Sequence, residues 1–259
     1  TRLIKNLYLA GQLNGTSGYE EAAGQGVLAG INAGCRAKGL ADFILKREDS
    51  YIGTMVDDLI TKDIFEPYRM LTSRSEFRLL LRQDNAIFRL GERAYAVGAL
   101  TDSEITQIRS EQDAIQQHLK DWKKGRTDSS VMKKYGLDHA IPLTDLFKRP
   151  EIQISTLLDW GLITEAQKES AHRALVEIKY SGYIQKQEKD VEKIAKYESK
   201  RIPKNFDFNV LSGLRQESKE KFIEYQPEAI FDAKRIAGIN PADIMILITY
   251  FEKYRMKAV

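Results

Sequence analysis

The sequence predicts a mainly α fold, in which a short strand–loop–helix segment is followed by an all-helical region. Three observations lead to this class. Apolar residues recur at helical spacing over most of the chain. Capping signals, glycines and prolines divide it into segments of helix length. One apolar run alone, residues 7–10, has the length and the glycine boundary of a strand.

The composition limits the class of protein before any motif is considered. The chain has 259 residues, 42% of them hydrophobic, which is enough for one large domain or two smaller ones. No apolar run approaches the roughly 18 residues of a membrane span, and no signal peptide is visible. The single cysteine, Cys35, excludes an internal disulfide and fits the cytoplasm. The three histidines lie far apart, so we predict no metal site.

The first element is the apolar run at residues 7–10, which ends at a glycine and precedes a small-residue helix over about residues 19–33. Strand, glycine loop and helix together can bring backbone N–H groups near a dinucleotide. The glycine spacing is not that of the dinucleotide fingerprint, and Glu20 and Glu21 would repel a phosphate. The loop therefore fits a less charged part of a cofactor, such as a flavin ring. It fits equally well a helix that only packs against a sheet.

The later elements follow from caps and apolar stripes. Residues 73–76 and 101–104 have the pattern of capping boxes. Residues 126–140 are polar and predict a loop, and a helix from Thr164 is expected to break at Gly182. A charged helix is expected over about residues 183–200, and three tail helices over about residues 211–224, 228–237 and 241–254.

Positive charge gathers in two places. Residues 68–93 carry six arginines against three acidic residues, and residues 179–204 carry eight Lys or Arg against four. Arg74, Arg78 and Arg82 would form one ridge if their segment is helical, and guanidinium groups match phosphate geometry. A solvated face with internal ion pairs is the alternative. The lysine stripe at residues 186–200 is the weaker candidate, since such stripes usually only solubilise a surface.

Several long motifs resemble one known family. They are AGQLNGTSGYEEAAGQGVLAGINA at residues 10–33, YIGTMVDDLITK at 51–62, EPYRMLTSRSEFRLLLRQDNA at 66–86 and EIKYSGYIQKQ at 177–187. Together they resemble the GidA/MnmG family, the FAD-dependent flavoproteins that add a carboxymethylaminomethyl group to the wobble uridine of tRNA. The tail departs from the family pattern at residues 227–233, where a glycine and a glutamine are lost.

The resemblance implies a C-terminal portion of such an enzyme, without the nucleotide loop and the reactive cysteines. We therefore expect no catalytic residue here, little activity and weak FAD binding. The expected domains are residues 1–48, a remnant of the FAD-binding domain; 49–203, a helical tRNA-interaction region; and 204–259, a subdomain for docking a partner. A non-enzymatic helical RNA-binding or adapter module is the alternative.

The resemblance also implies site residues and partners. Six residues are expected to face FAD in the complete enzyme: Gln12, Asn14, Gly15, Thr16, Gly18 and Tyr19. Five are expected to contact tRNA: Arg69, Arg74, Arg78, Arg82 and Arg89. Four on the last helix are expected to dock a tRNA-modification GTPase, with core packing as the alternative: Ile244, Leu247, Ile248 and Phe251. Family members are homodimers, so a homodimer is expected too.

Overall fold

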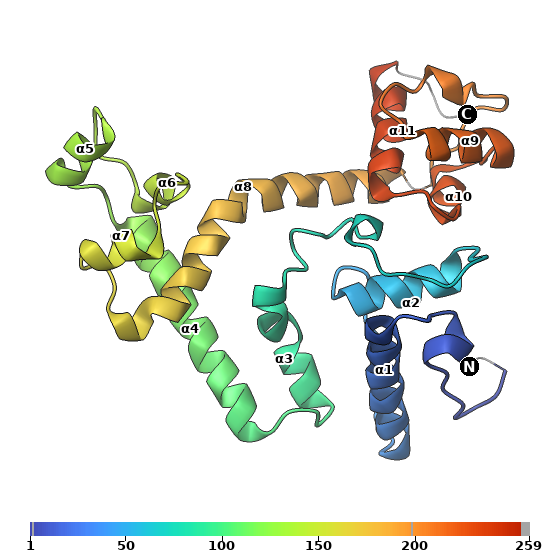
Figure 1. Cartoon of the computed structure of the whole chain (residues 1–259), viewed down its shortest axis with the longest axis horizontal. Coiled ribbons are helices and arrows are strands. Elements are labelled where there is room, and N and C mark those ends of the chain that lie inside the picture. Colours follow the sequence, from blue (N-terminus) through green and yellow to red (C-terminus); the bar gives the residue numbers. More distant parts are fainter. Residues whose placement is uncertain (2, 198, 255–259) are drawn as a thin grey trace. The chain divides into compact units, whose positions relative to one another are not determined.

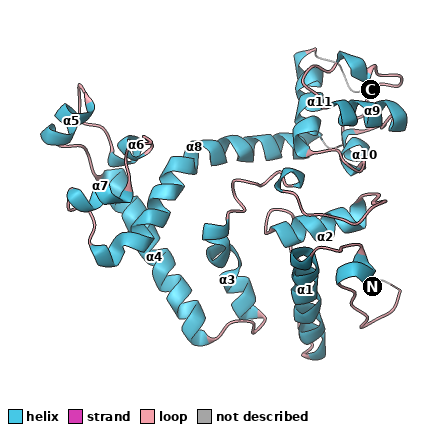
Figure 2. Cartoon of the chain, in the orientation of Figure 1, coloured by secondary structure: helices cyan, strands magenta, loops and turns pink. Residues whose placement is uncertain are grey.

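The computed structural model describes residues 1, 3–197 and 199–254, and its regular structure is helical (Figure 1). The α-helices are α1 (Tyr19–Ala37), α2 (Tyr51–Thr61), α3 (Ala86–Ala96), α4 (Asp102–Lys124), α5 (Ser129–Tyr135), α6 (Leu143–Phe147), α7 (Ile154–Asp159), α8 (Lys168–Tyr197), α9 (Gln216–Tyr225), α10 (Ile230–Arg235) and α11 (Pro241–Lys253). Figure 2 shows helices and loops but no strand in the described residues. The mainly α class is thus confirmed. None of the described helices combines the length and the apolar character needed to cross a membrane.

The chain divides into two compact units. One unit consists of residues 1–82 and 186–259, and the other of residues 83–185. Helix α8 contributes residues to both. Each unit contains a buried hydrophobic cluster of its own.

The unit of residues 83–185 is built around α4 and the first part of α8. Thr101 and Glu104 form the predicted capping box at the start of α4. Helix α4 sends Trp122 into the core, where its ring meets Phe147 edge-on with the centroids 5.1 Å apart. The polar stretch predicted as a loop contains α5, because the Asp128 side chain accepts hydrogen bonds from two backbone N–H groups and Val131 is buried in the core. That loop prediction is wrong.

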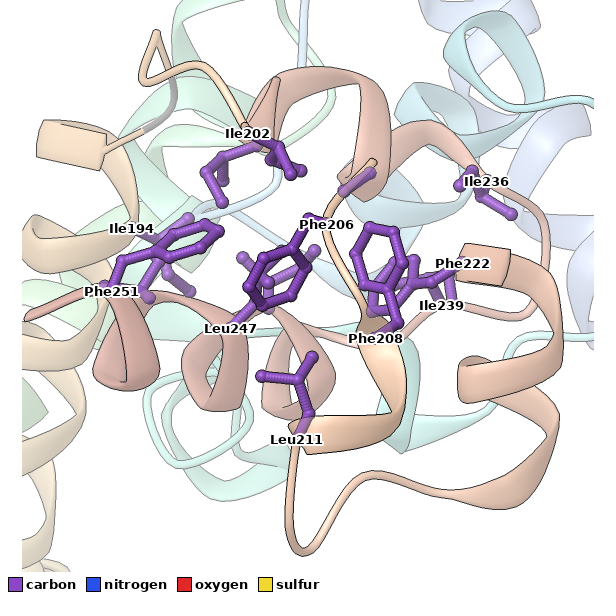
Figure 3. Close-up of a cluster of buried hydrophobic side chains, with 14 residues drawn as sticks. Ile194, Ile202, Phe206, Phe208, Leu211, Phe222, Ile236, Ile239, Leu247 and Phe251 are labelled. Atoms are coloured by element: carbon purple, nitrogen blue, oxygen red, sulfur yellow. The ribbon is translucent and has the colours of Figure 1, made fainter. Parts of the chain in front are cut away.

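The C-terminal helices of the other unit enclose an aromatic core (Figure 3). Phe206 packs edge-on against Phe208 and Phe251 at centroid distances of 5.0 and 5.2 Å. The predicted tail helices exist as α9, α10 and α11, and Pro241 opens α11 as expected. Helix α9 starts later than predicted, at Gln216, because a 3-10 helix at Phe208–Val210 and a turn precede it.

Three further predictions are corrected. Residues 7–10 form no strand in the described structure, since no neighbouring segment supplies a ladder for their backbone groups. Residues 73–76 do not cap an α-helix but end a 3-10 turn at Thr72–Arg74. Gly182 does not break a helix, because α8 runs through it from Lys168 to Tyr197. A glycine weakens a helix without removing a hydrogen bond, unlike proline.

Candidate cofactor and nucleic-acid site

The glycine loop before α1 is a short, uncharged turn. It begins with a 3-10 helix at Gly11–Asn14. Gly11 opens this helix and Gly15 follows it, and both adopt left-handed backbone conformations, with φ of 72° at Gly11 and 85° at Gly15. Only glycine takes up these angles without strain. The Asn14 amide donates to Gln25 on α1, and the Gln25 amide donates to the Thr16 hydroxyl, each over 2.8 Å. The loop is therefore fixed to the helix that follows it.

The loop lies directly beside the segment that carries the first arginines. Thr16 and Tyr68 form an isolated parallel bridge, and the Tyr68 N–H donates to the Gly15 carbonyl over 2.8 Å. Both residues of the bridge are 1% exposed. Two predicted sites that are about fifty residues apart in the sequence thus form one continuous region.

The buried Arg47 guanidinium holds the arginine segment in place. Its Nε and Nη2 donate to the Glu76 carboxylate, over 2.9 to 3.1 Å, and its Nη2 also donates to the Arg74 carbonyl over 2.8 Å. Its Nη1 donates to Asp58 over 2.7 Å and to Asp57 over 2.9 Å. Burial alone would lower the pKa of Arg47, but the carboxylates of Glu76 and Asp58 outweigh it and raise that pKa.

Asp58 connects this network to Tyr68 and α2. The Tyr68 hydroxyl donates to Asp58 over 2.8 Å, and the Lys62 ammonium lies 3.3 Å from the same carboxylate. Asp58 itself is fully buried. Burial and the neighbouring Asp58 charge raise the pKa of Tyr68, so the phenol stays protonated and remains a donor. Sequence reasoning missed this network, although the acidic pair inside the apolar α2 segment was a signal for it.

The predicted tRNA-contacting arginines do not form a helical ridge. Residues 75–82 are turns and bends rather than helix, so Arg74, Arg78 and Arg82 do not share one helix face. Arg69 and Arg78 are exposed. Arg74 stacks its guanidinium over the Tyr68 ring, 4.6 Å from the centroid, and donates to the Arg69 carbonyl. The premise of a ridge is therefore wrong, whereas contact of these side chains with RNA stays a prediction.

Arg82 and Arg89 are held by nearby groups, and the two residues belong to different compact units. An Arg82 Nη1 donates to the Leu79 carbonyl over 3.1 Å, and the Arg89 Nε donates to the Asn85 side chain over 2.8 Å. Both arginines are half-buried.

The residues predicted to face a cofactor fall into two groups. Gln12, Asn14 and Gly15 are exposed, and Tyr19 is 90% exposed at the start of α1. Thr16 and Gly18 are buried within the loop itself. A cavity of about 510 Å³ is lined by residues 5–9, α1 and residues 42–45, and Asn14 is the one predicted cofactor residue that lines it.

The loop suits the edge of a flavin ring better than a phosphate. Residues 11–19 carry no charge, and Gln12 and Asn14 present amide groups to the surface. Glu20 and Glu21 follow in the first helical turn, where they would oppose an anion. The residues present therefore fit the neutral ring system of a flavin.

The four apolar residues predicted to dock a partner lie in the core instead. The exposed fractions are 1% for Ile244, 0% for Leu247 and Ile248, and 7% for Phe251. They pack against the aromatic cluster shown in Figure 3. A side chain that is already buried offers no docking surface, so the docking prediction for these residues is corrected to core packing.

Comparison with known proteins agrees with the helical architecture. Three family models match: "Glucose inhibited division protein A" over residues 1–41, "tRNA modifying enzyme MnmG/GidA C-terminal helical domain" over 101–188, and "tRNA modifying enzyme MnmG/GidA C-terminal helical bundle" over 190–258. The solved structure of Aquifex aeolicus GidA in its form II crystal superposes with a TM-score of 0.69 at 37% identity, covering 96% of this chain and 41% of that one.

Two curated relatives of similar sequence have the same name. The tRNA uridine 5-carboxymethylaminomethyl modification enzyme MnmG of Geobacillus kaustophilus is 44% identical over all of this chain and 43% of its own length. That of Bacillus subtilis is 42% identical over 99% of this chain and 42% of its own length. The fold is thus that of GidA-type C-terminal helical regions.

The chain belongs to the MnmG/GidA family. It spans less than half the length of the curated relatives it matches.

Proposed function

We propose that this chain is the C-terminal portion of an FAD-dependent enzyme that adds a carboxymethylaminomethyl group to the wobble uridine of tRNA. Family membership supports the reaction class, since the relatives carry the name of that enzyme. One structural observation supports the role of this portion. The Thr16–Tyr68 bridge joins the flavin-type loop to the segment of Arg69, Arg74 and Arg78. A nucleotide held by the arginines would lie beside the cofactor loop.

In this proposal the chain supplies positioning rather than reacting groups. When bound, FAD would supply the redox chemistry. The amides of Gln12 and Asn14 would hydrogen-bond the edge of the flavin ring, and the exposed Gly15 would allow close backbone approach. The exposed Arg78 would bind an RNA phosphate, and the exposed Arg69 would contact the nucleotide beside it. The portion alone would have little activity and would bind FAD weakly.

The C-terminal helices keep a proposed role in docking a partner GTPase, through exposed residues other than the four on α11. The four residues first expected to dock are buried, whereas Phe231 is 46% exposed and Tyr254 is 56% exposed. Partially exposed aromatic side chains are common anchors at protein interfaces. Homodimer formation and a cytoplasmic location are also proposed for the complete protein.

The tRNA role is tested with Arg78→Gln in the complete protein, because Arg78 is exposed and Arg74 is engaged with Tyr68. The affinity for tRNA should fall, and the slope of log affinity against log salt should flatten by about one unit per lost phosphate contact. Lys123→Gln, at an exposed position on α4, is the matched control. Unchanged affinity and slope in Arg78→Gln would remove this arginine from the proposed tRNA site.

A further inference from the structure

A second pocket, of about 350 Å³, lies between the N-terminal ends of α1 and α2 and the residues after Tyr68. It borders the cofactor loop. A Cβ built on Gly18 would lie 3.3 Å from the guanidinium carbon of Arg69, which lines the pocket, and Tyr19 precedes Glu20 on its wall. The volume falls within the range of about 300–1,000 Å³ that is common for small-molecule sites. None of the predicted cofactor residues lines this pocket.

The floor of the pocket is apolar and closely packed. Ile52, Met55 and Met70 line it, and Met55 is only 2% exposed. Gly24 allows α1 and α2 to approach here, since a Cβ at that position would lie 3.1 Å from Ile52 and 3.6 Å from Met55. Methionine side chains adapt to flat surfaces and make favourable contacts with aromatic rings. Such a floor suits a planar ring.

The rim of the pocket carries opposite charges. The Arg69 side chain is 62% exposed, and Glu20, which also lines the pocket, is exposed, so the pocket offers both a hydrogen-bond donor and an acceptor. Nucleobase edges carry the complementary pattern of acceptors and donors. A planar ring with such an edge therefore matches both the floor and the rim.

The buried Glu21 fixes the rim. Its Oε1 accepts the Met70 N–H over 2.9 Å and lies 3.3 Å from the Arg69 Nε, and its side chain is 5% exposed. The Met70 hydrogen bond and the Arg69 charge lower the pKa of Glu21, so the carboxylate is ionised and keeps Arg69 at the pocket mouth. The other oxygen, Oε2, has no hydrogen-bond partner among the described residues. Glu21 therefore anchors Arg69 from inside the pocket wall and does not present its charge at the surface.

We propose that this pocket receives the base of one unpaired RNA nucleotide. The ring lies on Ile52 and Met70, Arg69 and Glu20 hydrogen-bond its edge, and Glu21 acts as a positioning residue for Arg69. RNA is recognised through splayed-out bases of single-stranded loops, and enzymes that act on a base hold it in a pocket of this kind. The inference rests on the proposed tRNA function and deepens it, because it places the wobble base next to the cofactor loop.

The test uses the complete, FAD-loaded protein and two RNAs. One is an anticodon stem-loop with uracil at the wobble position, and the other is identical but abasic there. Thr72→Trp fills the pocket, because Thr72 lines it at an exposed position. Arg69→Met removes the donor and keeps the test open if Thr72→Trp does not fold. Arg78→Gln is the control, since Arg78 does not line the pocket.

The unmodified protein should bind the uracil-containing RNA about tenfold more tightly than the abasic RNA, as expected for one bound base. This ratio should fall to near one in Thr72→Trp and Arg69→Met. Arg78→Gln should weaken both complexes equally and keep the ratio. If the unmodified protein binds both RNAs equally, or if both pocket variants keep its ratio, the pocket proposal is overturned while the tRNA function stands. If no RNA binds in a salt-dependent way, both proposals fail.

Discussion

Arg47 shows how much of the site depends on one buried side chain. Its guanidinium contacts two carboxylates, Asp58 and Glu76, that are themselves almost fully enclosed, and it also binds the backbone at Arg74. A local pattern could not reveal this, because Glu76 lies 29 residues further along the chain. By contrast, the Thr101 capping box was predictable, because its partners are three residues apart.

Replacing Arg47 should lower the free energy of unfolding. In Arg47→Met, Asp58 and Glu76 keep their burial but lose their main counter-charge, and breaking a buried ion pair typically costs about 3–5 kcal/mol. Chemical denaturation should show that the unit containing residues 1–82 loses unfolding free energy in this range. Lys46→Gln is the control, because Lys46 and its partner Glu48 are exposed in the same unit, and its midpoint should barely move. A midpoint for Arg47→Met equal to that of the control would contradict the role given to the network.

Asp243 is a buried carboxylate at the start of α11, and its ionised form is expected to stabilise the packing around it. Burial raises its pKa, but hydrogen bonds from Arg215, the Asn240 N–H and Ser218 outweigh this and lower it below the ordinary 3.8. A lowered carboxyl pKa gives stability that is complete above the unfolded-state value and is lost as the pH falls through the folded-state value.

Asp243→Asn should therefore destabilise the protein near neutral pH, and the difference from the unmodified protein should shrink as the pH falls below about 3.8. Thermal melts at a series of pH values measure this difference. Glu220→Gln, on the exposed side of α9, should show no such trend. A difference between Asp243→Asn and the unmodified protein that stays constant with pH would contradict the stabilising role given to the Asp243 carboxylate.

Among the helices, two glycines have different structural roles. Gly53 in α2 lies where a Cβ would be 2.0 Å from the Lys46 carbonyl oxygen, so the turn before α2 packs directly on the helix. A Cβ on Gly182 in α8 would meet no atom within 4 Å beyond its chain neighbours and the nearby backbone of its own helix. The sequence predicted that a helix would end at Gly182, because glycine is a poor helix former. The prediction failed here because the local glycine signal competed with the propagation of a long helix.

Alanine substitutions should separate these two roles. Gly53→Ala forces a side chain into the Lys46 backbone, so it should destabilise the protein by about 1–3 kcal/mol. Gly182→Ala removes only backbone entropy of the unfolded chain, so it should stabilise α8 by roughly 0.5–1 kcal/mol. Circular dichroism melts of the two variants provide the comparison. A stable Gly53→Ala protein would show that the close approach at Lys46 is not required.

At the scale of the whole molecule, the sequence predicted the segments better than their association. The helix-forming tail, the α4 cap and the uncharged glycine loop were all visible in local patterns. The Thr16–Tyr68 bridge and the Glu21–Met70 contact were not, because they join residues about fifty positions apart. The burial of the α11 residues also depends on partners elsewhere, such as Phe206 and Phe208, so an apolar stripe could not distinguish core from docking surface.

We propose that the glycine loop and the first arginine segment form one surface for a tRNA nucleotide. Photo-crosslinking measures this most directly, with 4-thiouridine at the wobble position of tRNA bound to the complete protein and the linked peptides identified by mass spectrometry. Crosslinks are expected within residues 12–21 and 51–72. Crosslinks confined to residues 83–185 or to α9–α11, with none in those two stretches, would contradict it.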